Sequence, residues 1–202
     1  ISGSSPYSQY TDELGAAHGE FTLSREYIES MLRSTIDEEF LTLDLNERMI
    51  FMYGVSKISS EQNIMLTTFP GAQYSAQSLA ELLDVFAKAG IVVDMICQSA
   101  PRGSSVDFSF TTSYDNFAAV MKALPAAAKA NPPLVSGGYS KIQPSFGEES
   151  VTLGVAARAL AALAGAGIEI VLITTSDLDI SLLIRQQDED TALDALHKAF
   201  EV

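Results

Sequence analysis

One carboxylate distinguishes two nearly repeated segments of this chain. The segment AGIVVDMICQS (89–99) returns as AGIEIVLITTS (166–176), and Asp94 of the first copy is matched by Val171 of the second. A carboxylate near a strand end can hold an ammonium group of a ligand, or it can simply face water. From the surrounding residues alone, the second interpretation, in which Asp94 faces water, is favoured. Val171 at the matching position indicates that the strand of the second copy packs.

Few other residues have the types and spacing that chemistry requires. The two histidines, His18 and His197, lie far apart and no Cys/His cluster accompanies them, which argues against a zinc site. No Gly-x-x-x-x-Gly-Lys phosphate loop occurs, and no Arg/His/carboxylate set suggests a catalyst. The single cysteine, Cys97, excludes an internal disulfide and fits a reducing compartment. We therefore expect no catalytic residue, no metal and no cofactor in this chain.

The composition limits the classes of partner. The chain has 202 residues, of which 47% are hydrophobic, and a formal net charge of −14. An acidic surface repels nucleic acid and anionic membranes, because both are bound through Lys and Arg. No apolar run approaches the roughly 20 residues that span a bilayer, and the N-terminus lacks a signal-peptide pattern. These features predict a cytoplasmic protein that binds neither. The chain begins with Ile1, which predicts a fragment or a processed product.

The first copy of the repeat reads as strand, helix, strand, strand, helix. NIMLTTF (63–69) is rich in strand formers and ends at the turn signal Pro70-Gly71. Residues 78–90 have the apolar spacing of a helix buried along one face, residues 91–97 follow as a strand, and SVDFSFTT alternates like a half-buried strand. A second helix is predicted over 114–124, where Pro125 interrupts it.

The second copy repeats this order. SKIQPSF (140–146) is its first strand, although Pro144 argues for an edge or a strand end. Helices are predicted over 151–167 and 190–200, with strands at 168–174 and 178–184 between them.

Each copy lacks one strand of a βαββαβ unit. LVSGGY (134–139) can close the first copy and IFMYGVSKI (50–58) the second. The expected fold class is α+β, with two ferredoxin-like units at 59–139 and at 50–58 plus 140–202, the first nested within the second. Residues 1–49 form a partly helical segment before them, either a tether or a contact surface.

Three stretches resemble the regulatory region of aspartate kinases, which is built from two ACT domains. They are GIVVDMICQS (90–99), GVAARALAALAGAGIEI (154–170) and the ending ITTSDLDISLLI to DEDTALDALHKAF (173–200), and the resemblance covers about residues 51–202. That family also nests its first ACT domain within the second.

The resemblance implies a function in feedback control. The parent enzyme would phosphorylate aspartate with ATP, the first step towards lysine, threonine and methionine. The ACT region would bind an end-product amino acid, lysine or threonine, and regulate a kinase domain. The Lys-Phe-Gly-Gly motif of such a kinase domain is absent here. This chain is therefore expected to be inactive alone, with ATP needed only in the absent domain.

The resemblance also implies an effector site shared by two chains, whose first ACT domains pair into a homodimer. Asp94 would hold the ligand ammonium, Gln98 would form hydrogen bonds across the interface, and the hydroxyls of Ser75 and Ser78 would bind the ligand carboxylate. The strand of the site maps onto Asp94, Met95, Ile96, Cys97, Gln98 and Ser99, and the loop onto Ala72, Gln73, Tyr74, Ser75, Ser78 and Leu79. Gln77 stands where the family has a glycine, so we expect a reshaped loop.

Other interpretations stay open at this point. Gln98 and Ser99 could be plain turn residues. The whole chain could be a free-standing ACT protein that binds an amino acid and regulates another partner. RNA-binding RRM domains share the β-α-β-β-α-β order, but they need exposed aromatic residues and a basic face. Phe108 and Phe110 are expected to point inward, and the charge is −14, which argues against RNA.

Overall fold

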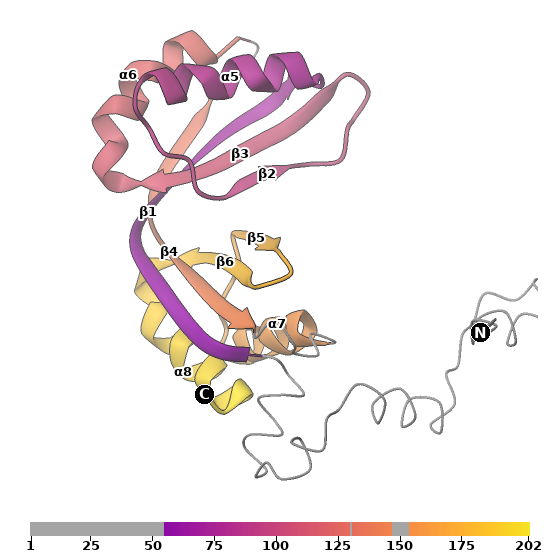
Figure 1. Cartoon of the computed structure of the whole chain (residues 1–202), viewed down its shortest axis with the longest axis vertical. Helices are drawn as coiled ribbons and strands as arrows, with labels where there is room; N and C mark the ends of the chain where they lie inside the picture. The colour runs from indigo at the N-terminus through magenta and orange to yellow at the C-terminus, as the bar shows by residue number, and fades with distance from the viewer. Residues whose placement is uncertain (1–54, 130, 147–153) are drawn as a thin grey trace, which may run out of the picture. The chain divides into compact units, whose positions relative to one another are not determined.

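The computed structural model describes residues 55–129, 131–146 and 154–202 (Figure 1). The chain divides into two compact units, Ile1–Leu43 and Asp44–Val202, and every described residue belongs to the second. The predicted segment 1–49 and most of the predicted strand 50–58 lie outside the described residues. In the described part of the chain, no helix is long and apolar enough to cross a membrane.

A six-stranded antiparallel sheet forms the centre of this unit, in the order β2-β3-β1-β4-β6-β5. Two long strands, β1 (Val55–Gln73) and β4 (Leu134–Phe146), pair with each other in its middle. On one side lie β3 (Ser105–Ser113) and the edge strand β2 (Ile96–Gln98), and on the other β6 (Ile180–Arg185) and the edge strand β5 (Leu172–Thr175). Both halves of the unit therefore share β1 and β4.

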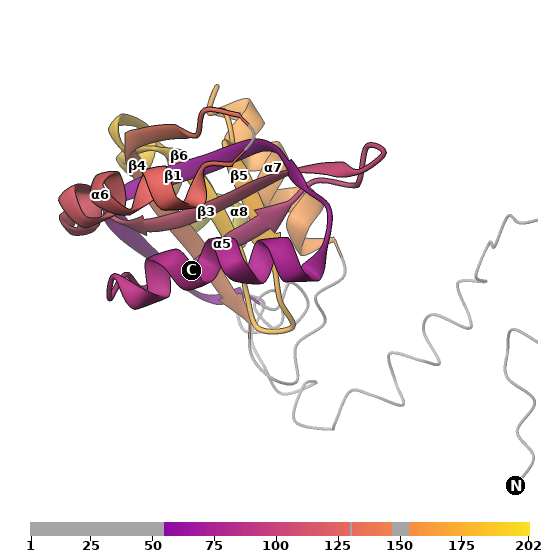
Figure 2. The same cartoon turned by 90° about the horizontal axis from the view of Figure 1, so that it is seen from above.

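Each half carries its own pair of helices, as Figure 1 shows, and Figure 2 presents the same elements from above. The first half has α5 (Ala76–Lys88) and α6 (Phe117–Ala127), and the second has α7 (Val155–Gly165) and α8 (Glu189–Phe200). Short 3-10 turns, η1 (Tyr114–Asn116) and η2 (Gln186–Asp188), lead into α6 and α8. The order strand, helix, strand, strand, helix thus occurs twice, which confirms the α+β class of two ferredoxin-like units. Their predicted boundaries stay a prediction.

The first half has an aromatic core. The Phe86 and Phe110 rings pack edge to face with centroids 4.9 Å apart, and Phe69 lies 6.1 Å from each. Phe108 is 3% exposed and Phe110 0% exposed. Both therefore point inward, as their alternation with polar residues predicts, and they offer no stacking platform for RNA bases.

Helix α5 forms where the apolar spacing predicts it. Ser75 caps its first turn, because the Ser75 hydroxyl accepts a hydrogen bond from the Ser78 N–H at 3.1 Å. Leu82 and Phe86 lie one turn apart and are buried against the sheet. Gly90 follows the helix with a φ of +74°, which suits a glycine after a C-terminus.

The prediction of separate short strands is wrong. Residues 55–58, the described part of the strand predicted at 50–58, join those predicted at 63–69 in β1, and those at 134–139 and 140–146 join into β4. Pairing continues because register shifts between Glu61 and Leu66 absorb the mismatch, with Asn63 at a φ of 57°. The predicted turn at Pro70-Gly71 is likewise a bulge within β1, where the Gly71 N–H donates to Asp107 Oδ1 at 3.0 Å.

The two proline predictions have different outcomes: Pro144 lies close to the end of its strand, as predicted, whereas Pro125 does not interrupt its helix. Pro144 lies inside the central strand β4, opposite Ile58. It is tolerated because the ladder to β6 ends at Ile142, so Pro144 needs no N–H on that side. Pro125 lies within α6, which continues past it to Ala127. The strands predicted at 91–97 and 168–174 shorten to β2 and β5.

Candidate functional site

Asp94 lies just before β2, and its carboxylate is paired. The Asp94 N–H donates to the Thr111 carbonyl at 3.0 Å, which joins this segment to β3. Its Oδ2 lies 2.5 Å from Nζ of Lys141 on β4, and Glu61 Oε2 on β1 lies 3.3 Å from the same nitrogen. The Asp94 side chain is 48% exposed and that of Lys141 only 11%. Asp94 therefore does not simply face water, because a lysine 47 residues away in the chain contacts its carboxylate.

Lys141 stays charged in this arrangement. Burial acts to lower the pKa of its ammonium group, but the hydrogen bonds and charges of Asp94 and then Glu61 outweigh burial and raise that pKa above the usual value. A positive charge with two carboxylates thus links three strand segments that are far apart in the chain.

Val171 occupies the matching position of the second half. Its N–H donates to the Leu183 carbonyl at 2.8 Å, as that of Asp94 does to Thr111, so the backbone of the repeat is preserved. The Val171 side chain is nevertheless 38% exposed. The predicted packing of this strand therefore comes from its neighbours Ile170 and Leu172, which contact the apolar clusters, and not from Val171 itself.

The rest of the predicted strand group divides by burial. Met95 is 5% exposed and joins a small apolar cluster with Ile64 and Leu183, so its side chain cannot contact a ligand from solvent. Ile96 is 48% exposed on the edge strand, and Gln98 is exposed as well. Ser99 is half-buried, and it exchanges two hydrogen bonds with Asp107: the Ser99 N–H donates to the Asp107 carbonyl at 2.9 Å, and the Ser99 hydroxyl accepts from the Asp107 N–H at 2.9 Å, which continues the pairing of β2 with β3.

The predicted loop group surrounds a separate hollow of about 280 Å³. Ala72, Gln73, Ser78 and Leu79 line it, together with Phe69, Pro70, Leu82, Ala127, Lys129 and Asn131. Neither Asp94 nor Gln98 is among the residues that line this hollow. The structure thus divides the predicted site residues of one chain into two groups.

Two serines predicted to bind a carboxylate are engaged with each other. The Ser75 and Ser78 hydroxyls lie 2.8 Å apart at the start of α5. Tyr74 is 51% exposed, and its N–H donates to the Ser104 carbonyl at 2.8 Å, which joins the loop to the β2–β3 turn. Ser78 remains on the wall of the hollow, where its hydroxyl can turn towards a ligand.

Sequence reasoning missed the far wall of this hollow. Lys129 and Asn131 come from the spacer after α6, and the Asn131 amide donates to the Pro70 carbonyl at 3.0 Å. Lys129 also contacts Glu81 on α5 at 3.1 Å. The stretch AKANPP (128–133) could have indicated this wall. It ends the helix and leads the chain back to the sheet beside the first loop.

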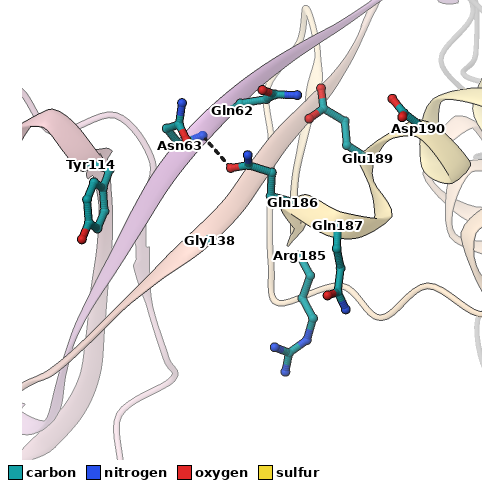
Figure 3. A pocket seen from close by; sticks show the side chains of 9 residues that line it. All are labelled: Gln62, Asn63, Tyr114, Gly138, Arg185, Gln186, Gln187, Glu189 and Asp190. Carbon is teal, nitrogen blue, oxygen red and sulfur yellow. Dashed lines mark hydrogen bonds between the residues drawn. The ribbon is translucent and has the colours of Figure 1, made fainter.

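A larger and more polar hollow of about 630 Å³ lies where the two halves meet (Figure 3). Its wall comprises Gln62, Asn63, Tyr114, Gly138, Arg185, Gln186, Gln187, Glu189 and Asp190. The Asn63 N–H donates to Gln186 Oε1 at 3.0 Å across it. Among the described residues, no group of three or more potential metal ligands gathers.

Comparison with known proteins gives three kinds of match. Residues 150–200 match the family model of the ACT domain. The chain is 29% identical over 177 residues to an aspartokinase of Bacillus sp. (strain MGA3), a match that covers 83% of this chain and 40% of that protein. The chain thus spans about two fifths of the length of such relatives.

Solved structures agree. The regulatory subunit of aspartate kinase from Thermus flavus matches with a TM-score of 0.67 and 26% identity, over 73% of this chain and 99% of that one. E. coli aspartokinase III, solved in complex with lysine and aspartate, matches with a TM-score of 0.54 and 20% identity, over 73% of this chain and 33% of that one, which shows the shared fold alone.

These matches define the class of protein. The described part of the chain has the ACT-domain fold of aspartate kinase regulatory regions. Its relatives in sequence and structure are aspartate kinases and their regulatory subunits, which confirms the resemblance seen in the sequence.

Proposed function

We propose that this chain is the regulatory region of an aspartate kinase and binds an end-product amino acid, lysine or threonine. One observation carries the proposal: the Asp94 carboxylate already binds an ammonium group, that of Lys141, at 2.5 Å. An amino-acid effector presents the same chemical group. E. coli aspartokinase III, a protein of the same fold, was solved in complex with lysine, which supports a ligand of this kind.

The effector carboxylate would lie at the loop group. The Ser78 hydroxyl, in the first turn of α5, lies on the wall of the smaller hollow, near the positive end of the helix dipole. Because this loop and Asp94 lie apart within one chain, we propose that the loop of one chain faces the strand of a second, as the resemblance implies.

The edge strand β2 supports such a homodimer. β2 pairs with β3 on one side only. Ile96 is 48% exposed and Val92, near β2, 78% exposed. An edge strand with exposed apolar side chains favours pairing with another strand edge, and identical chains can pair about a two-fold axis.

The activity of the parent protein is proposed from its aspartate kinase relatives alone. A kinase domain of the parent chain would perform aspartate phosphorylation with ATP, and this region would need no cofactor of its own. The cytoplasm is the proposed compartment, which suits a chain with a single cysteine.

A second candidate is a separate regulatory chain that binds an amino acid and acts on a partner. It is favoured by the Thermus flavus match, in which a regulatory subunit of similar extent forms a chain of its own. Purification of the native protein distinguishes the two candidates. A kinase domain in the same polypeptide as this region supports the first candidate, and a polypeptide without a kinase domain supports the second.

Isothermal titration of the 202-residue chain with lysine, threonine, methionine and isoleucine tests effector binding. We expect lysine or threonine to bind, and Asp94→Ala to weaken that binding by about tenfold or more, because a charge-assisted hydrogen bond is lost. Glu169→Ala is the matched control, since Glu169 is an exposed acid in the second copy of the repeat. Failure of all four amino acids to bind would refute the proposal.

Light scattering tests the shared pocket separately. We expect a dimer at micromolar concentration, and replacing Ile96 on the β2 edge with Lys to favour the monomer, because a charge on a bare edge opposes pairing. A strictly monomeric wild-type chain that still binds the effector would contradict a pocket formed by two chains.

A further inference from the structure

We propose that Lys141 is an internal competitor of the effector: its ammonium group occupies the place beside Asp94 that the effector ammonium takes, and binding transfers Lys141 to Glu61. This inference rests on the proposed function. It adds a residue of β4 that neither the resemblance nor the repeat pattern points to.

The position of Lys141 in the sheet is the first argument. Lys141 lies on β4, one of the two strands that both halves share, with Glu61 on β1 and Leu183 on β6 as its register partners. Asp94 belongs to the first half alone. The ion pair between Asp94 and Lys141 therefore ties the segment before β2 to a strand that continues into the second half (Figure 1).

The chemistry of the two cations is the second argument. The Lys141 side chain and the α-ammonium of an amino acid each offer three N–H donors and one positive charge. Two such cations at one carboxylate repel each other. An effector that binds Asp94 through its ammonium must therefore displace Lys141 at least in part.

Glu61 offers Lys141 a second counter-ion, which lowers the free-energy cost of moving Lys141 away from Asp94. Lys141 is only 11% exposed, so an ammonium group without a counter-ion would be costly there. Glu61 Oε2 already lies 3.3 Å from Lys141 Nζ and can close on it when Asp94 turns to the ligand. Both carboxylates are about half exposed, so each keeps access to water throughout.

The expected effect on affinity follows from this exposure. A partly exposed ion pair is weak, and removing its cation should strengthen effector binding by about two- to fivefold. Lys141→Met removes the competing charge but keeps the length of the side chain. Lys141→Arg keeps a cation beside Asp94, so we expect no such gain.

Two measurements on the full 202-residue chain test the inference, with unlabelled L-lysine and L-threonine as probes. Titration calorimetry compares the wild type with Lys141→Met and Lys141→Arg. NMR of protein with ¹³C-labelled lysine follows the Cε signal of Lys141, assigned by its loss in Lys141→Arg. We expect this signal to shift as the probe saturates, while that of Lys57, an exposed lysine on β1, stays in place.

The outcomes separate this inference from the proposed function. A probe that binds without moving the Lys141 signal and with equal affinity for Lys141→Met overturns the inference and leaves the proposed function standing. Binding of neither probe overturns both. If Lys141→Met does not fold, as judged by circular dichroism, the NMR titration of the wild type decides.

Discussion

Glu189 begins helix α8 and holds it against the two shared strands. Its side chain is 5% exposed, and Oε2 accepts a hydrogen bond from the Ser140 hydroxyl of β4 at 2.9 Å. The side chains of Ser60 and Gln62 on β1 also donate to this carboxylate. We expect Glu189→Gln to destabilise the protein, because it removes the charge from a buried group surrounded by donors.

The cost can be worked from these contacts. Hydrogen bonds to a charged group contribute about 1.5–3 kcal/mol and neutral ones about 0.5–1.5 kcal/mol. A carboxylate in the first turn of a helix adds about 0.3–1 kcal/mol. Because the substituted glutamine amide would keep one acceptor oxygen, we expect the free energy of unfolding to fall by about 2 kcal/mol at about pH 7.

The cost should depend on pH in a defined direction. Burial acts to raise the pKa of Glu189, but the hydrogen bonds from Ser60, Ser140 and Gln62 outweigh burial and lower that pKa below the usual value. A lowered folded-state pKa means that the stabilisation is complete above the unfolded value of about 4.3. It is lost as the pH falls through the folded-state pKa.

Urea denaturation of both proteins between about pH 7 and pH 3.5 measures this difference. We expect a constant gap from pH 7 to about pH 5 and a narrowing gap below about pH 4. Asp194→Asn on the exposed side of α8 is the control and should show little gap at any pH. A gap that is absent at neutral pH, or equally large at the acid end of the range, would show that the charge of Glu189 does not stabilise the fold.

Three further experiments probe other contacts by urea denaturation. Ser75→Ala removes the cap of α5 and should cost about 1 kcal/mol. Phe110→Ala opens a cavity in the aromatic core and should cost about 3–5 kcal/mol, because Phe110 is 0% exposed. A double-mutant cycle of Asp94→Asn and Lys141→Met should give a coupling energy of about 0.5 kcal/mol that declines in about 1 M salt.

Each of these three experiments has a control variant or an outcome that would contradict it. Ser75→Asn can still accept the hydrogen bond and should be close to the wild type. Phe117→Ala, at a side chain that is 40% exposed, should cost much less than the change at Phe110. A coupling energy of zero between Asp94 and Lys141 would mean that their contact does not stabilise the unliganded chain.

The architecture was largely readable from local patterns. Helix α5 forms where Leu82 and Phe86 repeat at helical spacing, and β3 forms where Phe108 and Phe110 alternate with polar residues. Such periodicities act within short windows, because a helix or strand must place its apolar residues on one face. The two copies of one unit, and hence the fold class, followed from these windows.

The continuity of the long strands was not readable in this way. Glycine, asparagine and proline interrupt the sequence patterns of β1 and β4, and they predicted turns or strand ends. In the folded chain the two strands continue through a register shift near Asn63 and past Pro144. Pairing with each other supplies hydrogen bonds that neither segment has alone.

The candidate site, like the fold, could be predicted from the sequence only in part. The sequence by itself determined that one copy of the repeat carries an acid and that a serine-rich loop precedes α5. Only the tertiary structure decided that Asp94 has Lys141 as its counter-ion, and that Asn131 closes a hollow over Pro70. These partners are 47 and 61 residues apart in the chain. Sheet order and register bring them together, and no short window of sequence encodes a contact at that separation.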